Sequence, residues 1–235
     1  MKKSSRIIVV ALALALVLAF GAQAALAQDQ CTLTLIGVGW SDLLNPENPK
    51  TVSVLIKAGP GVSAGAIADV RTAINDWDTV LADIRAHSTS AAPDLEIVEG
   101  VRTADIVIKM KVGGGAVLGM ANPRTYPNSC ILKSASIQLS GKALGEPFTS
   151  EGRRFTATHE LGHALGLGHS NDPQDLMYTY GDPSATQVVP ISECDKDGLR
   201  AIYNPYSHAF DCSIPRSVTC DCLVPSIGSD TGFSF

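Results

Sequence analysis

The chain has 235 residues, of which 45% are apolar and 17% are charged, with 21 glycines and 13 prolines. This balance can bury a sizeable core and excludes a disordered, collagen-like or coiled-coil chain, while the length favours one large domain with appendages. The formal net charge is −5, so the chain has no electrostatic footprint for nucleic acid, and we expect no nucleic-acid partner.

The first 27 residues resemble a secretory signal peptide. Three basic residues within 1–6 precede a continuously apolar run over 7–20, and small residues occupy the two positions of 25–27 that a signal peptidase reads. The apolar run is shorter than the roughly 20 residues that span a bilayer. We therefore expect cleavage after Ala27 and a mature chain that is secreted, or held in the periplasm or cell envelope, without stable insertion in a membrane.

All six cysteines lie beyond this leader, and an even number in an exported chain favours disulfides. Fifteen complete pairings are possible, and the sequence does not choose among them. A cysteine zinc site is disfavoured because a single residue separates Cys220 from Cys222, a spacing unlike that of metal ligands. The six are Cys31, Cys130, Cys194, Cys212, Cys220 and Cys222.

The mature chain begins with a polar stretch over 28–50 that contains Pro46 and Pro49, and we expect it to be an irregular lead-in. Residues 51–57 alternate apolar and polar side chains, which predicts a strand. A helix follows from a cap at Ser63 to about residue 84, because six apolar residues recur at steps of three and four. Those six are Ile67, Val70, Ile74, Trp77, Leu81 and Ile84.

Four more strands are predicted, at 95–98, 104–111, 116–121 and 134–140. The triple glycine before the third of these lacks the lysine and the helix start of a phosphate-binding loop, so it indicates a flexible connection. Pro123 follows the third strand, which suits the edge of a sheet or a loop.

A helix that begins at Thr149 or Ser150 carries the residues with the clearest chemistry. His159 and His163 are one turn apart, so at roughly 100° per residue their rings project about 40° apart and can bind one ion. Glu160 lies near that ion but outside its coordination sphere. The other face of the helix is apolar and predicts packing into the core through Ala157, Leu161 and Ala164.

Gly166 falls three residues after His163, where a left-handed residue can end the helix and turn the chain so that His169 becomes a third ligand. Three neutral imidazoles leave a tetrahedral zinc with one open position for water, as in catalytic sites. Zinc lowers the pKa of that water toward about 7, and Glu160 can take its proton and later protonate a leaving amine. We therefore predict one catalytic Zn²⁺.

The string His-Glu-x-x-His-x-x-Gly-x-x-His over 159–169, followed by a methionine turn at Met177, resembles the metzincin metallopeptidases. Among them the chain is most similar to the matrixins, the family of the matrix metalloproteinases and their microbial relatives, over residues 51–203. The resemblance implies an α/β (α+β) catalytic domain with a five-stranded, mixed, twisted sheet, one antiparallel edge strand at 116–121, and three helices, the last over 192–203. Met177 would underlie the three histidines as an apolar base and not as a ligand.

Three features of the matrixins have no counterpart here. Residues 112–130, where animal members hold a second zinc and calcium, contain no His, Asp or Glu, so Ca²⁺ is possible but not indicated. The paired aspartates of the last helix appear as Cys194 and Asp195, so only the second of the pair matches. The Pro-Arg-Cys-Gly motif of the latency propeptide is missing.

We therefore expect four segments: a signal peptide (1–27), the lead-in (28–50), a matrixin-like zinc peptidase domain (51–205) and a cysteine-containing tail (206–235). The hypothesis is a secreted, monomeric zinc endopeptidase that cleaves proteins or peptides with Glu160 as general base. Two alternatives stay open. One is a binding or adhesion module on the same scaffold without turnover, against which Glu160 argues; the other is a zinc exopeptidase of narrow specificity.

Overall fold

The computed structural model describes most of the chain beyond the leader. The predicted signal peptide and most of the predicted tail lie outside the described residues. The chain divides into a unit of residues 1–30, of which only Gln30 is described, and a unit of 31–235, which holds everything that follows. No helix in the described part is long and apolar enough to cross a membrane. The described ranges are 30–42, 49–88, 90–114, 117–143, 145–182, 184–203 and 216–221.

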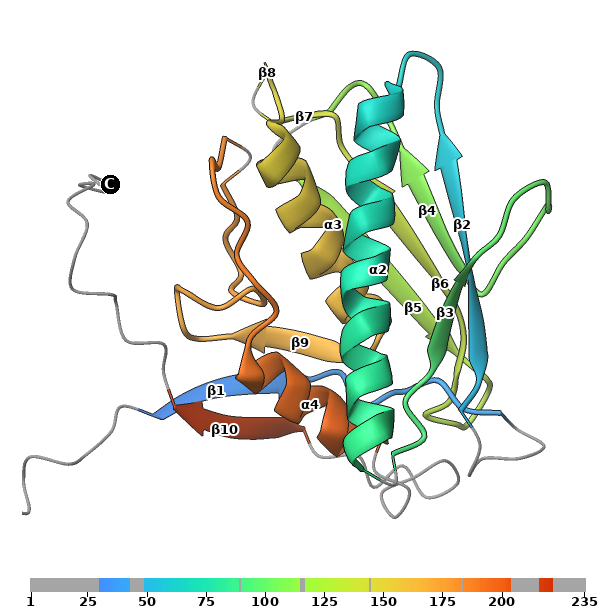
Figure 1. Ribbon diagram of the computed structural model, residues 1–235, viewed down its shortest axis with the longest axis vertical. Coiled ribbons are helices and arrows are strands. Elements are labelled where there is room, and N and C mark those ends of the chain that lie inside the picture. Colours follow the sequence, from blue (N-terminus) through green and yellow to red (C-terminus); the bar gives the residue numbers. More distant parts are fainter. Residues whose placement is uncertain are drawn as a thin grey trace, which may run out of the picture. The chain divides into compact units, whose positions relative to one another are not determined.

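A five-stranded sheet forms the centre of the domain, in the order β3-β2-β4-β6-β5 (Figure 1). The first four are parallel, and β5 runs antiparallel to β6 at one edge. This is the mixed sheet with one antiparallel edge strand that the resemblance predicted. The bounds are β2 Thr51–Ala58, β3 Asp94–Ile97, β4 Ile106–Met110, β5 Gly119–Thr125 and β6 Leu132–Leu139.

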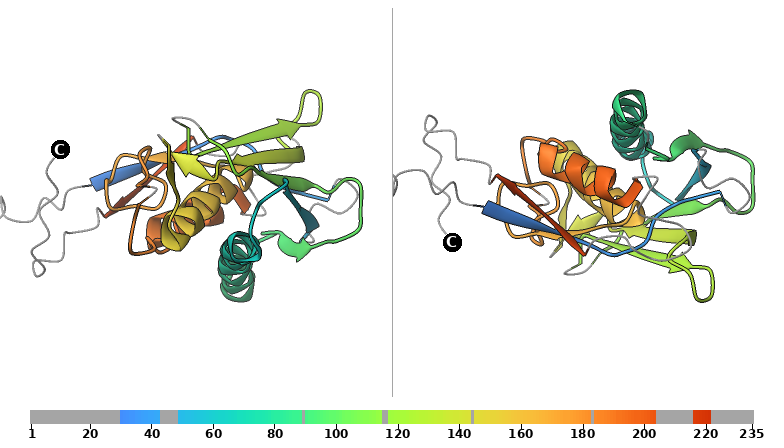
Figure 2. Two further views of the ribbon diagram at one scale, coloured as in Figure 1. Left: turned by 90° about the horizontal axis from the view of Figure 1, so that it is seen from above. Right: turned by 90° about the horizontal axis from the view of Figure 1, so that it is seen from below.

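Within the described residues, three helices complete the domain, as expected: α2 (Ala64–His87), α3 (Ser150–Ala164) and α4 (Glu193–Tyr203). The views from above and below show α2 and α3 over the same face of the sheet (Figure 2). The apolar stripe of α2 is buried against the rest of the domain. Within it, Trp77 is fully buried, and its indole N–H donates to the Thr158 carbonyl of α3 at 2.8 Å. Burial of each large apolar side chain of this stripe contributes roughly 1.5–3 kcal/mol to the free energy of unfolding. This packing and the Trp77 hydrogen bond hold α3 against α2.

Hydroxyl caps start both long helices where the sequence indicated. Ser63 accepts a hydrogen bond from the Ala66 N–H at 3.1 Å, and Thr149 accepts one from the Gly152 N–H at 2.9 Å. These bonds satisfy backbone donors that have no partner inside the helix.

The edge strand β5 lies further along the chain than predicted. It spans Gly119–Thr125 instead of 116–121 and includes Pro123, which is opposite Ala135 of β6. Proline cannot donate to a ladder, but an edge strand has one unpaired side, so the residue is tolerated there. Two very short strands that we did not predict, β7 (Lys142–Ala143) and β8 (Glu146–Pro147), form a hairpin before α3.

The expectation of an irregular lead-in over 28–50 was wrong at its start. Residues Gln30–Leu35 form strand β1, which lies between β10 (Ser217–Asp221) and β9 (Leu167–Ser170) in a second, three-stranded sheet (Figure 1). The cause is an alternation of apolar side chains in this stretch: Cys31, Leu33 and Leu35 are all buried. The prolines that suggested irregularity lie further on.

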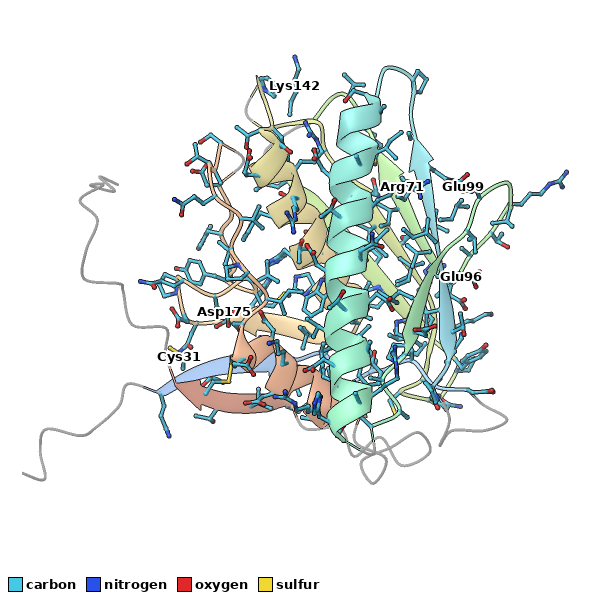
Figure 3. The ribbon with its side chains drawn as sticks, viewed as in Figure 1. Cys31, Arg71, Glu96, Glu99, Lys142 and Asp175 are labelled. Carbon is cyan, nitrogen blue, oxygen red and sulfur yellow. A yellow bond between two sulfur atoms is a disulfide. The ribbon has the colours of Figure 1, made fainter. Side chains whose placement is uncertain are left out.

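The disulfides predicted for an exported chain are confirmed at one described pair. Cys194 of α4 is bonded to Cys220 of β10, with their Cα atoms 5.6 Å apart. Cys31, which lies at the start of β1 (Figure 3), is also disulfide-bonded. Cys212 and Cys222 lie outside the described residues, and Cys130 is buried.

Two buried carboxyl groups attach α4 to the turn that follows β9. The Ser192 hydroxyl donates to Asp175 at 3.0 Å and accepts from the Asp195 N–H at 3.0 Å, while the Ser192 N–H donates to Asp195 Oδ2 at 2.8 Å. The other oxygen, Asp195 Oδ1, is buried without a hydrogen-bond partner among the described residues, and the Asp195 carboxyl group interacts electrostatically with Asp175. Burial, and then the charge of Asp175, raise the pKa of Asp195 well above its usual range.

The substitution Asp195→Asn tests this assignment through the pH dependence of stability. The pKa of Asp195 is 3.8 in the unfolded chain and higher in the native state, so between these two values the native carboxyl group keeps a proton that the unfolded chain has released. The contribution of Asp195 to the free energy of unfolding therefore falls as pH rises from 3.8 toward the raised pKa. An amide can donate to Asp175 at every pH. We expect the variant to match the parent near pH 4 and to be more stable by about 1–3 kcal/mol near pH 8, measured by urea unfolding of metal-free protein. A difference that is constant with pH would contradict the assignment.

Candidate metal centre

Three histidines converge beside the C-terminal half of α3. His159 and His163 lie on the helix and His169 lies on β9, and one ring nitrogen of each is within 4.8 Å of the others. The three rings form a compact cluster, with centroids 4.7 to 5.6 Å apart. The structure therefore brings together the three residues that the sequence predicted as ligands.

Hydrogen bonds orient two of the three rings. His159 Nδ1 lies 2.8 Å from the Leu176 carbonyl oxygen, and His163 Nδ1 lies 2.9 Å from the Leu167 carbonyl oxygen. A carbonyl can only accept, so each Nδ1 carries the proton and each Nε2 keeps a free lone pair. Backbone carbonyls hold metal-binding histidines in this way in many proteins, and this donor set fits zinc.

The electrostatics of the cluster favour neutral rings. Burial, and then the charge of neighbouring His159, lower the pKa of His163 to about 4, and burial also lowers the pKa values of His159 and His169. A metal ion binds the neutral form of imidazole. Near pH 7 these rings are already neutral, so they can bind a metal ion without first releasing a proton.

The chain reverses at Gly166 directly after α3, as the sequence indicated. Gly166 has φ = 108°, and a Cβ there would lie 2.4 Å from the Val38 carbonyl oxygen, so only glycine fits. The carbonyls at the end of α3 are capped by side chains from distant segments: the Trp40 indole donates to Ala164 at 2.9 Å, and the Tyr203 hydroxyl donates to Leu165 at 2.8 Å. These caps fix the point at which the chain turns toward His169.

Met177 is fully buried behind the histidines. A Cβ on Gly162 would lie 2.5 Å from Met177 Sδ, so the thioether packs directly on the helix between the first two histidines. Leu176, its neighbour, supplies the carbonyl that holds the His159 ring. The turn thus supports the cluster from below with an apolar contact and one hydrogen bond.

Glu160 lies between α3 and the edge strand. It is 7% exposed, and the Ala121 N–H of β5 donates to its carboxylate. Burial raises the pKa of Glu160 to about 7, although the Ala121 hydrogen bond opposes the shift. A Cβ on Gly119 would lie 2.6 Å from Glu160 Cγ, so β5 approaches this side chain closely. The carboxyl group can therefore both accept and donate a proton near neutral pH.

A hollow of about 370 Å³ opens beside two of the histidines. One side is formed by the end of β1 and the segment after it, and the other side by β5. Its lining is Thr34, Leu35, Ile36, Ala121, Pro123, His163, Gly168 and His169.

Sequence reasoning missed several residues of this region. Thr34 and Trp40 come from the predicted lead-in, to which we assigned no role, and Ala121 acts through its backbone, which no residue type reveals. The signal that could have found β1 is the alternation of Cys31, Leu33 and Leu35.

The comparison with known protein families agrees with this geometry. The family model of the matrixins matches residues 148–204, which include α3, the three histidines, Met177 and α4. The expectation that this chain is a microbial relative of the matrix metalloproteinases stays a prediction.

Individual relatives match over short stretches. Human matrilysin is 41% identical over 70 residues, which cover 29% of this chain and 24% of matrilysin. Metalloendoproteinase 1 of Glycine max is 36% identical over 92 residues (39% and 30% of the two chains), and interstitial collagenase of Sus scrofa is 44% identical over 66 residues (28% and 14%). The chain thus spans less than a third of the length of these relatives. The segment that carries the three histidines, together with α3 and α4, is therefore similar to the matrixins.

Proposed function

We propose that the protein is a zinc-dependent endopeptidase that hydrolyses peptide bonds in proteins, with His159, His163 and His169 as zinc ligands. The observation that carries the proposal is the pairing of this three-histidine cluster with Glu160. A site that only bound metal would not need a buried carboxyl group beside the position that three ligands leave open.

Zinc in this site supplies a Lewis acid and an acidified water. Glu160 accepts a proton from the water that attacks the peptide carbonyl carbon, and the same carboxyl group then donates a proton to the leaving amine nitrogen. The raised pKa of Glu160, about 7, suits both steps, because a group that titrates near the working pH exchanges protons in either direction. The roles of general base and general acid thus fall to one residue.

The edge strand supports binding of an extended substrate. β5 is paired only with β6, so its other side offers backbone groups to a peptide, which can add as a further strand. Ala121 of this strand also holds Glu160. A peptide docked along β5 would therefore pass close to the proton acceptor. Recognition through the main chain accepts many sequences and favours internal bonds over free termini.

We further propose that the protein works outside the cytoplasm as a monomer. The proposed boundaries are a signal peptide over 1–27, a lead-in over 28–50, a peptidase domain over 51–205 and a tail over 206–235. The Cys194–Cys220 disulfide supports export, because disulfides persist in oxidising compartments. The disulfide also joins the tail strand β10 to α4. β10 and the lead-in strand β1 form the second sheet together with β9 of the peptidase domain.

The substitution Glu160→Gln tests the peptidase. We expect the parent to cleave end-blocked peptides from a diverse mixture, and the variant at matched zinc content to be slower by a factor on the order of 10² to 10⁴. Chelation should abolish cleavage by the parent, and added zinc should restore it. The measurement is mass spectrometry of the products over time.

Two controls separate the alternatives. Cleavage of unblocked peptides alone would indicate an exopeptidase. A parent that binds zinc yet leaves both kinds of peptide intact would contradict the peptidase and favour a binding module.

Export is tested by the N-terminus of the protein recovered outside the cell. We expect the recovered chain to begin at Gln28, because the small residues at 25 and 27 fit a signal peptidase. N-terminal sequencing checks the cut, and replacement of Ala27 by a bulky residue should leave the leader attached. A parent recovered only inside the cell with Met1 present would contradict export.

A further inference from the structure

The two strands that meet at the third histidine do not pair residue for residue. Along β1 and β9, Leu33 is opposite Ser170 and Leu35 is opposite Leu167. One residue of β1, Thr34, therefore faces two residues of β9, Gly168 and His169. This is a β-bulge. A bulge beside a functional site can change the direction of a side chain, but it leaves one residue without its regular backbone hydrogen bonds to the neighbouring strand.

The Thr34 hydroxyl replaces the backbone hydrogen bonds that His169 loses at the bulge. Its Oγ1 accepts from the His169 N–H at 2.8 Å and donates to the His169 carbonyl at 2.9 Å. A single side chain thus satisfies both backbone groups of the third histidine. On either side the backbone resumes regular pairing, with Ile36 N–H donating to Gly166 O at 2.9 Å and Asn171 N–H donating to Thr32 O at 3.1 Å.

Gly168 provides the space for this arrangement. A Cβ at Gly168 would lie 2.3 Å from Thr34 Oγ1 and 2.9 Å from the Thr34 carbonyl oxygen. The hydroxyl therefore occupies the place that a side chain on the residue before His169 would take. The contact is specific to this bulge, because a Cβ in an ordinary ladder would point away from the facing backbone.

The third histidine needs such support more than the other two. Carbonyl oxygens hold the His159 and His163 rings, whereas no ring hydrogen bond to His169 is found in the described part of the chain. His169 is also exposed, so core packing does not fix it. Its position is set from its backbone.

We propose that Thr34 is a positioning residue for the third zinc ligand, and that β1 is for this reason part of the metal site. The proposal rests on the zinc site of the proposed function. Thr34 does not touch the metal; its hydroxyl holds the His169 backbone so that the ring meets the other two. The rest of β1 contributes apolar packing through Leu33 and Leu35, which removal of the hydroxyl leaves in place.

The test compares three variants of the exported chain for zinc affinity, measured by competition with a chromophoric chelator. Thr34→Val keeps the shape and the strand propensity of the side chain but removes the hydroxyl. Thr34→Ser keeps the hydroxyl. Thr32→Val is the matched control, because the Thr32 hydroxyl makes no hydrogen bond to the described residues.

We expect Thr34→Val to bind zinc about 10- to 100-fold more weakly than the parent, the usual effect of losing a group that orients a ligand. Thr34→Ser and Thr32→Val should bind within a few-fold of the parent. The melting temperature of metal-free Thr34→Val should stay close to that of metal-free Thr32→Val. The absorption spectrum of cobalt-substituted protein should change in Thr34→Val alone, because it reports the ligand geometry.

The inference is overturned if Thr34→Val binds zinc as tightly as the parent. It is also overturned if its weaker binding is matched by an equal loss of stability in the metal-free protein, since the hydroxyl would then serve only the sheet. Zinc affinity is measured without any peptide. A parent that binds zinc but cleaves nothing contradicts the proposed peptidase and leaves the result for Thr34 standing.

Discussion

The reversal of the chain after α3 is the constraint on which the metal centre depends. His159 and His163 lie on α3 and His169 lies on β9, so the backbone turns between them, at Gly166, three residues after His163. Gly166 allows the turn because a side chain would collide with the Val38 carbonyl. The last carbonyls of the helix have no partner inside it, and burying them without hydrogen bonds would be costly. The Trp40 indole and the Tyr203 hydroxyl donate hydrogen bonds to them. Segments far apart in the sequence thus converge on one helix terminus.

The three histidines are held by different means on the two sides of this turn. His159 and His163 are fixed by a rigid helix, by burial and by ring hydrogen bonds to Leu176 and Leu167. His169 is the one exposed residue of the short strand β9, and among the described residues only its backbone is held by hydrogen bonds. The site is therefore stiff on one side and dependent on strand pairing on the other. The disulfide from α4 to β10, next to β1 in the second sheet, ties that pairing to the domain.

The sequence predicted what depends on local spacing and missed what depends on distant pairing. The stripe of α2, the caps at Ser63 and Thr149, the left-handed Gly166 and the ligand spacing on α3 all lie within one element or one turn, so residue types reveal them. Strand β1 pairs with β9 across 135 residues, as the bond from Thr34 to His169 shows, and no local pattern states that register. The position of β5 was also misjudged, because Pro123 suggested an end where an edge strand continues.

In the proposed peptidase, the edge strand β5 would take part in both substrate binding and proton transfer. Burial favours the protonated form of Glu160 and raises its pKa to about 7, while the N–H that Ala121 donates favours the ionised carboxylate and opposes part of this shift. A peptide that adds to β5 would cover the same region and exclude more water. Its arrival would strengthen the burial effect and shift Glu160 toward the form that donates a proton. One strand would then set where the substrate lies and also how readily Glu160 protonates the leaving amine.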